Sequence, residues 1–464
     1  MIALKLLLLS VLASVSPAKT VKVSTQAEFD GLNTTVKKAL ATKPSQLTLV
    51  IEPGTYHFKD DHLDLSGLKC PDTELRIEGE GAVLVGMAPE VKISPFYRTS
   101  RVVDVVDAEK KLCRIKSGKR LSGSGKLYIQ VTAWYRLFTC PVTEIKNGYI
   151  YFTCEQLARN GLMYNINGDV SFGRKLPRYR LMRVQESSAP VSSAFFKVTD
   201  CDFRRVSLSG LTFDTNADGR SEYAKDCLIR FYMGRFESAE VSRCTFRSIR
   251  TDVVRIAYSD GVTVKDCRFE DCGRIGVLSY NHSARTVVED NVFERMGTYG
   301  EFNPCVRCSG TDYRIRRNHF TDYGCCAIGV GVHFSEKMEH PSSGIVADNT
   351  ITQTAAYRKD APMNLLMDTG AIYVWTQNAS LEIRDNIITD ISGPFDNRGI
   401  FCDDGTVNTV IEGNTILRIA NSYCIDLRRA LSVETRTDSQ IRKVNVGNRL
   451  GKNKTDGKIR FEQR

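Results

Sequence analysis

A short pattern of apolar and polar positions recurs along the C-terminal part of the chain. A β-branched residue is followed three positions later by Cys or Asn, and two positions further on by Phe or Ile. Successive Cys/Asn positions are 23, 24, 27, 31, 37 and 28 residues apart, so the unit is constant while the connections vary in length, which predicts a coil of short strands. After an apolar forerunner at Leu208/Leu211/Phe213, the matches are Val241/Cys244/Phe246, Val264/Cys267/Phe269, Val288/Asn291/Phe293, Ile315/Asn318/Phe320, Val346/Asn349/Ile351, Ile383/Asn386/Ile388 and Ile411/Asn414/Ile416.

Such a coil is a parallel β-helix, an all-β fold in which each turn stacks on the last at about 4.8 Å. Equivalent apolar side chains then form inward columns, because no single turn could bury its apolar face alone. Asn at one turn position can bond its neighbours up the stack and satisfy backbone amides at the bend. Cys244 and Cys267 occupy that column, and we interpret them as small buried residues, since no His recurs at an offset that would suit a nucleophile.

The first residues have the composition of an export signal. Residues 1–18 carry one positive charge before an apolar run too short to span a bilayer comfortably, followed by the small residues Ser16-Pro17-Ala18. We therefore expect a signal peptide, a secreted or periplasmic protein, and no integral membrane segment after the signal is removed.

The repeat divides the remaining residues into four parts. Residues 19–90 are expected to form an N-terminal cap and the first turns, because Thr25 and Glu28 have capping-box spacing before an amphipathic helix that can cover the open end. Residues 91–190 lack the coil pattern and predict a β-rich insertion. Residues 191–450 predict the main β-helix, and the Lys/Arg-rich residues 451–464 predict a solvated basic tail.

The strand that opens each turn is predicted to expose chemically active side chains on one outer face. Side chains alternate along a strand, so the first and third residues of each aligned quartet enter the core and the second and fourth face outward. Trp375, Asp403 and Arg428 then share an outer column on consecutive turns, with Tyr280 in that column at an earlier turn. The neighbouring outer column contains Arg255, Arg307, Tyr373, Phe401 and Asp426. The quartets start at Val254, Val277, Val306, Ile328, Ile372, Ile400 and Ile425.

An exposed aromatic platform beside carboxylates and guanidinium groups suits a sugar ring, which stacks on one side and bonds through its hydroxyls. The long connections 353–367, 389–398 and 333–343 flank this face and predict the walls of a groove, with Arg398 and His333 as further ligand contacts. An exposed Trp or Tyr can also merely cover a sheet. The clustering with Asp favours an oligo- or polysaccharide partner.

The densest chemical signal is a set of three carboxylates. Asp368 begins the segment Asp-Thr-Gly-Ala-Ile-Tyr, and Asp403 and Asp404 end the segment Gly-Ile-Phe-Cys-Asp-Asp one turn later. Glycoside cleavage needs two carboxyl groups, one protonated and one ionised, and stacked like charges would raise one pKa. The Asp-Gly at Asp404 is equally consistent with a turn.

On these residues the chain resembles the right-handed parallel β-helix proteins of the pectate-lyase-like superfamily, over about residues 45–90 and 191–450. The two Asp-containing segments are similar to those of β-helix glycoside hydrolases of the α-L-fucosidase and β-xylosidase types, which also carry a β-rich insertion. The resemblance implies a secreted bacterial enzyme acting on complex glycans, with Asp368 and either Asp403 or Asp404 as the catalytic pair.

Two other functions remain open on the same fold. A polysaccharide lyase would use Lys or Arg as base on an acidic glycan and would bring in Ca²⁺ as cofactor, which needs several converging carboxylates. The net charge of +10, from 64 Lys+Arg against 54 Asp+Glu, favours an anionic partner of this kind. A non-catalytic glycan-binding protein is the second alternative, because the coil can stand without an active site.

Motifs for other common functions are missing from the sequence. No Cys pairs have zinc-finger spacing, and no P-loop or Gly-rich dinucleotide motif follows a strand. The basic residues are spread along the chain instead of collected into a stripe, so no nucleic-acid partner is expected. For the hydrolase we expect no metal site, no cofactor and a monomer, and the 15 cysteines leave disulfides optional.

Overall fold

The structure is a computed structural model, and most of the chain between Ser16 and Glu462 is described below. The segments outside this description are residues 1–15, 60, 87–90, 95–96, 99–103, 117–122, 134–135, 156–177, 186–193, 215–226, 281, 298–302, 332–341, 357–368, 376–377, 393–396, 404–405, 421, 428–446 and 463–464.

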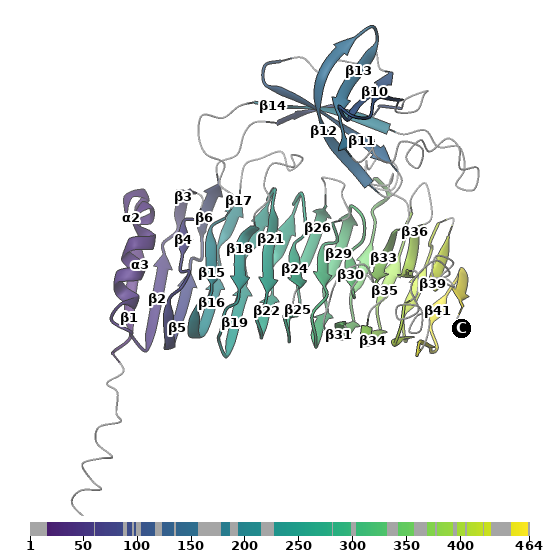
Figure 1. Cartoon of the computed structure of the whole chain (residues 1–464). Helices are drawn as coiled ribbons and strands as arrows, with labels where there is room; N and C mark the ends of the chain where they lie inside the picture. Colours follow the sequence, from purple (N-terminus) through teal and green to yellow (C-terminus); the bar gives the residue numbers. More distant parts are fainter. Residues whose placement is uncertain are drawn as a thin grey trace, which may run out of the picture.

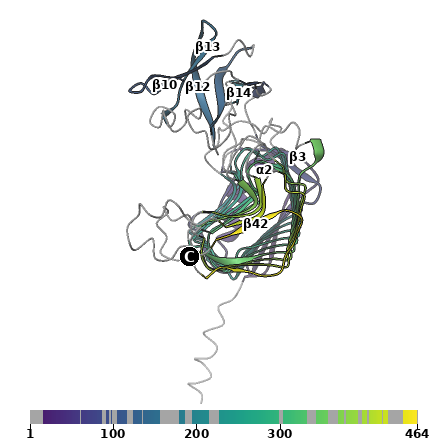
Figure 2. The ribbon, with the colours of Figure 1, turned by 90° about the vertical axis from the view of Figure 1, so that its right-hand side faces the viewer.

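Three long parallel sheets form the body of the molecule, and each turn of the chain adds one strand to each sheet (Figure 1). Seen along its axis, the coil has a closed cross-section (Figure 2). The predicted parallel β-helix is therefore confirmed. The first sheet, which carries the β-branched residues of the repeat, contains β1 (Lys19–Val23), β2 (Gln46–Ile51), β5 (Lys69–Glu78), β16 (Asp202–Ser209), β19 (Ser238–Ser242), β22 (Val262–Lys265), β25 (Val287–Glu289), β28 (Tyr313–Arg316), β31 (Ser342–Ala347), β34 (Asn378–Arg384), β37 (Thr409–Glu412) and β40 (Arg449–Leu450).

The second sheet is called the site sheet below, because it carries most of the predicted site residues. It contains β4 (Leu63–Asp64), β15 (Phe196–Thr199), β18 (Cys227–Tyr232), β21 (Asp252–Ala257), β24 (Val277–Tyr280), β27 (Val306–Cys308), β30 (Ile328–Val330), β33 (Thr369–Val374), β36 (Asn397–Cys402), β39 (Tyr423–Leu427) and β42 (Lys458–Phe461). The third sheet contains β3 (Gly54–Phe58), β6 (Ala82–Gly86), β17 (Thr212–Asp214), β20 (Thr245–Arg247), β23 (Arg268–Glu270), β26 (Val292–Met296), β29 (His319–Tyr323), β32 (Thr350–Thr352), β35 (Ile387–Thr389), β38 (Thr415–Leu417) and β41 (Lys454–Thr455).

The predicted Asn column stands at the bend between the first and third sheets. Asn349 is fully buried, and its Nδ2 donates to Oδ1 of Asn386 at 2.9 Å and to the carbonyl of Ile315 at 2.9 Å. Its own Oδ1 accepts from the backbone N–H of Asn318 at 3.1 Å. The residue just before each Asn, such as Asp348 with φ of 57°, turns the chain through the left-handed region. The Asn side chains thus supply the hydrogen bonds that backbone groups lose where the chain bends.

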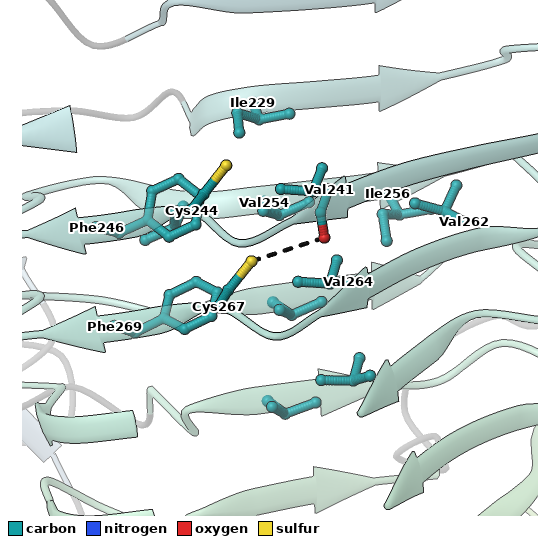
Figure 3. Close-up of a cluster of buried hydrophobic side chains, with 14 of the residues drawn as sticks. Ile229, Val241, Cys244, Phe246, Val254, Ile256, Val262, Val264, Cys267 and Phe269 are labelled. Atoms are coloured by element: carbon teal, nitrogen blue, oxygen red, sulfur yellow. Dashed lines mark hydrogen bonds between the residues drawn. The ribbon is translucent and has the colours of Figure 1, made fainter. Parts of the chain in front are cut away.

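Beside this column the aromatic residues of the repeat form a stack of rings. The centroids of Phe269 and Phe293 are 4.5 Å apart, and those of Phe293 and Phe320 are 4.8 Å apart. Figure 3 shows Cys244 and Cys267 on successive turns beside Phe246 and Phe269, with the Cys267 thiol directed at the carbonyl of Val241. Burial raises the pKa of Cys267 well above its usual range, so this thiol stays protonated and belongs to the core, as predicted.

All 15 cysteines lie among the described residues, buried and as free thiols. No helix of the described residues is long and apolar enough to cross a membrane.

Helices α2 (Gln26–Asp30) and α3 (Leu32–Leu40) cover the N-terminal end of the coil (Figure 1). Thr25 and Glu28 form the predicted capping box, each bonding the backbone of the other. Phe29, Leu32 and Val36 are buried against the first turn, which gives the open end an apolar cover.

A separate antiparallel sheet lies between the first turns and the main coil in the sequence, and it stands apart from the coil in both views (Figures 1 and 2). It has its own apolar cluster, which includes Ile115, Ile129 and Phe152. Its strands are β7 (Val91–Ile93), β8 (Tyr97–Arg98), β9 (Asp104–Asp107), β10 (Leu112–Lys116), β11 (Lys126–Ala133), β12 (Arg136–Lys146), β13 (Tyr149–Thr153) and β14 (Arg178–Val184).

The C-terminal residues differ from the predicted solvated tail, because they form the last turn of the coil. Strands β40, β41 and β42 pair with β37, β38 and β39 in the three parallel sheets. Asn453 extends the Asn column, accepting from Nδ2 of Asn414 at 2.9 Å. The Lys and Arg residues that suggested a tail alternate along the sequence with residues that pair in the sheets or extend the Asn column.

Replacing Asn349 by Leu should destabilise the coil, because the backbone N–H of Asn318 loses its acceptor inside the protein. Each buried group left without a partner costs about 1–3 kcal/mol, so we expect a loss of roughly 2–4 kcal/mol in the free energy of unfolding, measured by denaturant titration. The same change at Asn453, at the partly buried end of the column, is the control and should cost less. Equal losses would mean that the column does not act through buried hydrogen bonds.

Candidate functional site

Strands β30, β33, β36 and β39 of the site sheet align as the quartets predict. Ile372 lies opposite Ile400, and Ile400 lies opposite Ile425, with all three side chains in the core. Tyr373 lies opposite Phe401, and Phe401 lies opposite Asp426, in the neighbouring column. The predicted register and the predicted inward positions are therefore confirmed.

The aromatic side chains of these strands form a cluster of their own, distinct from the main core. The site cluster comprises Tyr373, Trp375, Phe401, Cys325 and Cys326. The ring of Tyr373 lies 4.8 Å from that of Trp375 and 5.2 Å from that of Phe401, both edge to face. Trp375 is only 7% exposed and Tyr373 only 5%, so the prediction of an exposed aromatic platform is wrong. The rings pack on one another and on the sheet instead of presenting their faces to solvent.

Trp375 is seated on a glycine of the preceding turn. A Cβ atom on Gly329 would lie 2.8 Å from Cζ3 of Trp375 and 2.9 Å from Cγ of Pro304. The guanidinium of Arg307, one turn further back in the same column, lies 4.9 Å from the centroid of the Trp375 ring, within cation–π range. The indole is therefore held between backbone, a cation and the Tyr373 ring.

Asp403 brings a carboxylate to the edge of the site cluster. The phenolic hydroxyl of Tyr373 donates a hydrogen bond to Oδ2 of Asp403. The backbone N–H of Asp403 continues the sheet register by bonding the carbonyl of Val374 at 3.0 Å, and the Thr406 side chain donates to the Asp403 carbonyl at 2.8 Å. Asp403 is half-buried, so its backbone is fixed while its carboxylate is less enclosed than the rings behind it.

Asp426 and Arg398, both predicted as exposed ligand contacts, are fully buried instead. Arg398 donates to Oδ2 of Asp426, and Arg460 donates to both carboxylate oxygens at 2.7 and 2.9 Å. The hydrogen bond from Arg460 to Asp426 raises the pKa of the Arg460 guanidinium. Arg398 also lies 3.9 Å from the centroid of the Phe401 ring. The prediction fails for Asp426 because Arg398 and Arg460 occupy both of its carboxylate oxygens. It fails for Arg398 because the guanidinium group contacts that carboxylate and the Phe401 ring.

Tyr280 shares the column of Trp375 but lies three turns away, which corresponds to about 14 Å along the axis. Burial raises its pKa, and the neighbouring charges that act on it are those of Arg255, Arg230 and Asp252. Tyr280 therefore belongs to a different group of side chains from the Tyr373–Asp403 pair.

Four predicted site residues, Asp368, Asp404, Arg428 and His333, lie outside the described residues. Among the described residues, no three His, Cys, Asp or Glu side chains gather in a way that could hold a metal ion.

Two contributors to the site, Gly329 and Arg460, were not predicted from the sequence. Gly329 occupies the Tyr373 column directly after Arg307, which was already predicted there, and this shared register was a signal that Gly329 supports the same rings. Arg460 was assigned to the tail. The signal that could have revealed it is Leu450/Asn453/Thr455, which repeats the spacing of the coil pattern.

Replacing Gly329 by Ala should displace the Trp375 indole, because the added methyl overlaps its ring. Overpacking of this kind costs about 1–3 kcal/mol, and the indole emission should shift. The chain contains two Trp residues, so the measurement uses a Trp134→Phe background. Gly31→Ala is the matched control, since its added Cβ would approach nothing closer than 3.6 Å. An unshifted emission spectrum in the Gly329 variant would contradict the close packing of Trp375 on Gly329.

Replacing Asp426 by Asn should cost far more stability than replacing Arg460 by Gln. The first change leaves Arg398 as a buried charge without its carboxylate, which costs about 3–5 kcal/mol. The second leaves Asp426 paired with Arg398 and removes a partner that is 27% exposed, for a loss of roughly 1 kcal/mol. The denaturant midpoints of the two variants are compared. Equal losses of stability would contradict the expected difference between the Asp426 and Arg460 variants.

Comparison with known proteins agrees with this architecture. A glycoside hydrolase of known structure is 10% identical, with a TM-score of 0.50 over 96% of this chain and 97% of that one. An α-1,3-glucanase catalytic unit from Streptomyces thermodiastaticus is 12% identical, with a TM-score of 0.30 over 82% of this chain and 99% of its own. A DFA-IIIase from Arthrobacter chlorophenolicus, in complex with DFA-III, is 9% identical, with a TM-score of 0.31 over 96% and 95% of the two chains. At 10% identity, the likeness to the first of these structures is one of fold alone.

No curated protein matches the sequence. The sequence profile of the right-handed β-helix region matches residues 188–445, which is more than half of the chain. Together with the three parallel sheets, this match shows that the chain belongs to the family of right-handed β-helix proteins.

Proposed function

We propose that this protein is an exported carbohydrate-active enzyme, a glycoside hydrolase in which Asp403 is one of two catalytic carboxylates. The observation that carries the proposal is the Tyr373 hydroxyl bonded to a half-buried carboxylate at the edge of a buried aromatic cluster. The fold by itself hosts many functions and decides none of them. Support for hydrolase chemistry must therefore come from the residues of the site.

The surroundings of Asp403 suit the ionised member of a carboxyl pair. A hydroxyl that donates to a carboxylate stabilises its charged form, which is the form that attacks the sugar carbon or activates water. The edge-to-face contact between the Tyr373 and Trp375 rings holds the Tyr373 hydroxyl in place. Tyr373 and Trp375 are thus positioning residues in this proposal, and the sugar is bound in front of them.

The protonated member would be Asp404 or Asp368, as the sequence analysis predicts. The similarity of both Asp-containing segments to the α-L-fucosidase and β-xylosidase types supports this pair. Asp426 does not fit the role, because both of its oxygens are bonded to guanidinium groups and its side chain is fully buried. A carboxyl group that gives up a proton to a leaving oxygen needs contact with the substrate.

The lyase alternative has less support from the described residues. A calcium-dependent lyase needs several oxygen ligands that converge on one ion. Asp403, just after β36, and Asp426, on β39, are held by Tyr373 and by two arginines. Arg307 and Arg398 are cations of the right kind for a lyase base, but both lie against aromatic rings.

Replacing Asp403 by Asn should reduce glycan hydrolysis by about 10³-fold without changing the unfolding midpoint. Tyr373→Phe removes only the hydrogen bond to the carboxylate and should reduce the rate by roughly 10- to 100-fold. Asp266→Asn, an exposed position with φ of 53° that Asn tolerates, is the matched control and should be silent. Activity is read as released reducing ends over a panel of glycans.

Three outcomes would overturn this assignment. Full turnover in the Asp403 variant would remove this residue from the catalytic pair. Products with ultraviolet absorption from a new double bond, in place of ordinary reducing ends, would establish a lyase. Binding without any turnover across the panel would establish a glycan-binding protein.

A further inference from the structure

Three aromatic side chains follow one another along an outer corner of the coil, where the chain leaves the site sheet. Tyr232 ends β18, Tyr258 directly follows the last residue of β21, and His282 comes two residues after the end of β24, so they stand on successive turns (Figure 1). The ring centroids of Tyr232 and Tyr258 are 5.6 Å apart, and those of Tyr258 and His282 are 5.5 Å apart. These three rings are called the aromatic row below.

The aromatic row reaches solvent, in contrast to the rings of the site cluster. Tyr258 is 44% exposed, His282 is exposed and Tyr232 is half-buried. Met233, which takes the place of Tyr258 on the turn before, is 47% exposed. Among the described residues five large apolar side chains are exposed, and two of them, Met233 and Tyr258, are neighbours here. Exposed apolar surface that gathers in one place indicates a binding surface.

The backbone at this corner has a conformation that does not favour large side chains. Met233, Tyr258 and His282 have φ of 53°, 49° and 55°, in the left-handed region. Asp200 takes the position of Met233 one turn earlier, with φ of 49°, and a short polar side chain tolerates this region at lower cost. Strained positions are concentrated at binding and catalytic sites. Stability alone therefore does not explain the large side chains at this corner.

A polar pair stands beside the rings. Asp260 follows Tyr258 by two residues, and its Oδ2 lies 2.7 Å from Nη2 of Arg285. The side chains of Asp260 and Arg285 are 44% and 64% exposed, so both reach water, and together they carry no net charge. Rings beside such groups match a neutral sugar, whose C–H face stacks on a ring and whose hydroxyls donate and accept hydrogen bonds. A purely apolar partner would desolvate the ion pair without replacing its hydrogen bonds to water.

The aromatic row lies far from Asp403 along the coil. Four turns separate β24 from β36, and six turns separate β18 from β36, which corresponds to about 19 and 29 Å. A sugar stacked on the row is therefore out of contact with the Asp403 carboxylate. A glycan bound only at the row is held by side chains that take no part in cleavage.

We propose that the aromatic row is a secondary, non-catalytic binding site for a neutral glycan chain. The rings follow the axis of the coil, so the chain lies along the axis and stacks successive sugars on them. The site goes beyond the proposed hydrolase function and does not depend on it, because the row binds sugar whether or not Asp403 is catalytic. For a hydrolase, such a site keeps the polymer near the enzyme and raises its effective concentration.

The first test is a footprint of tyrosine modification on the full-length protein carrying Asp403→Asn, so that the glycan is not cleaved. N-acetylimidazole acetylates accessible phenols, and peptide mass spectrometry reads each Tyr separately. The probes are dextran, xylan and barley β-glucan as neutral chains and polygalacturonate as an acidic one. We expect a neutral chain to protect Tyr258 and to leave Tyr149, half-buried on the separate antiparallel sheet, acetylated as before.

Three results of the footprint would overturn the proposal. They are an unprotected Tyr258 with every neutral chain, equal protection of Tyr258 and Tyr149, and protection of Tyr258 by polygalacturonate alone.

The second test replaces Tyr258 by Asn, which tolerates the left-handed backbone and so keeps the bend. In affinity electrophoresis through the neutral glycan that protects Tyr258, this change should raise the dissociation constant by about 10-fold, because a stacked ring is lost. Tyr258→Phe keeps the ring and should bind nearly as the parent does. Ile387→Ala is the matched control, since it removes an apolar side chain that is 48% exposed on the third sheet. It should leave the affinity unchanged, and equal losses in the Asn and Ala variants would overturn the proposal.

The outcome is separable from that of the proposed function. With Asp403 intact, the Tyr258→Asn variant should hydrolyse short substrates at the parent rate. Protection of Tyr258 without turnover in the parent protein would contradict the hydrolase alone. Turnover in the parent protein without protection of Tyr258 would contradict the aromatic row alone.

Discussion

The hydrogen-bonded Asn column is the constraint on which the other features of the coil depend. Each Asn links three turns, because its amide donates both forward to the next Asn and back to a carbonyl of the preceding turn. These bonds have little freedom in length or direction, so they fix the axial position of each turn relative to the next. The connections can then differ in length without disturbing the register. That is why residues far apart in sequence, such as Tyr373 and Asp403, meet reliably.

A fixed register also explains how the site sheet can hold charges that would otherwise be costly. Asp426 and Arg398 are fully buried, and breaking such a pair is expensive because the remaining charge has no solvent. The coil delivers Arg460 from the last turn to the same carboxylate, which satisfies its second oxygen. The aromatic rings of the site cluster rest beside this ion network, with Arg398 over Phe401. The result is a rigid support behind Asp403.

The sequence was sufficient for those features that follow from periodicity. Column membership, inward parity and the capping box at Thr25 could be predicted, because each depends on spacing along the chain. Exposure could not be predicted, because parity tells which side of the sheet a side chain occupies and not what lies over it. Trp375 illustrates this limit: its burial depends on Gly329 and Arg307, which come from two earlier turns. Asn453 was missed for a simpler reason, since basic residues around it masked the repeat.

Buried carboxylates paired with arginines occur in two parts of the site sheet, but the chain builds them in two ways. Asp252 and Arg255 belong to one strand, β21, and Arg274, from the connection before β24, bonds the second oxygen of Asp252. Arg398 lies on β36 and its partner Asp426 lies on β39, while Arg460 of β42 bonds the same carboxylate. In both places two guanidinium groups hold one buried carboxylate, so neither Asp252 nor Asp426 is an uncompensated charge in the sheet. The later arrangement depends on the register between three successive turns, whereas the earlier one is set largely within a single strand.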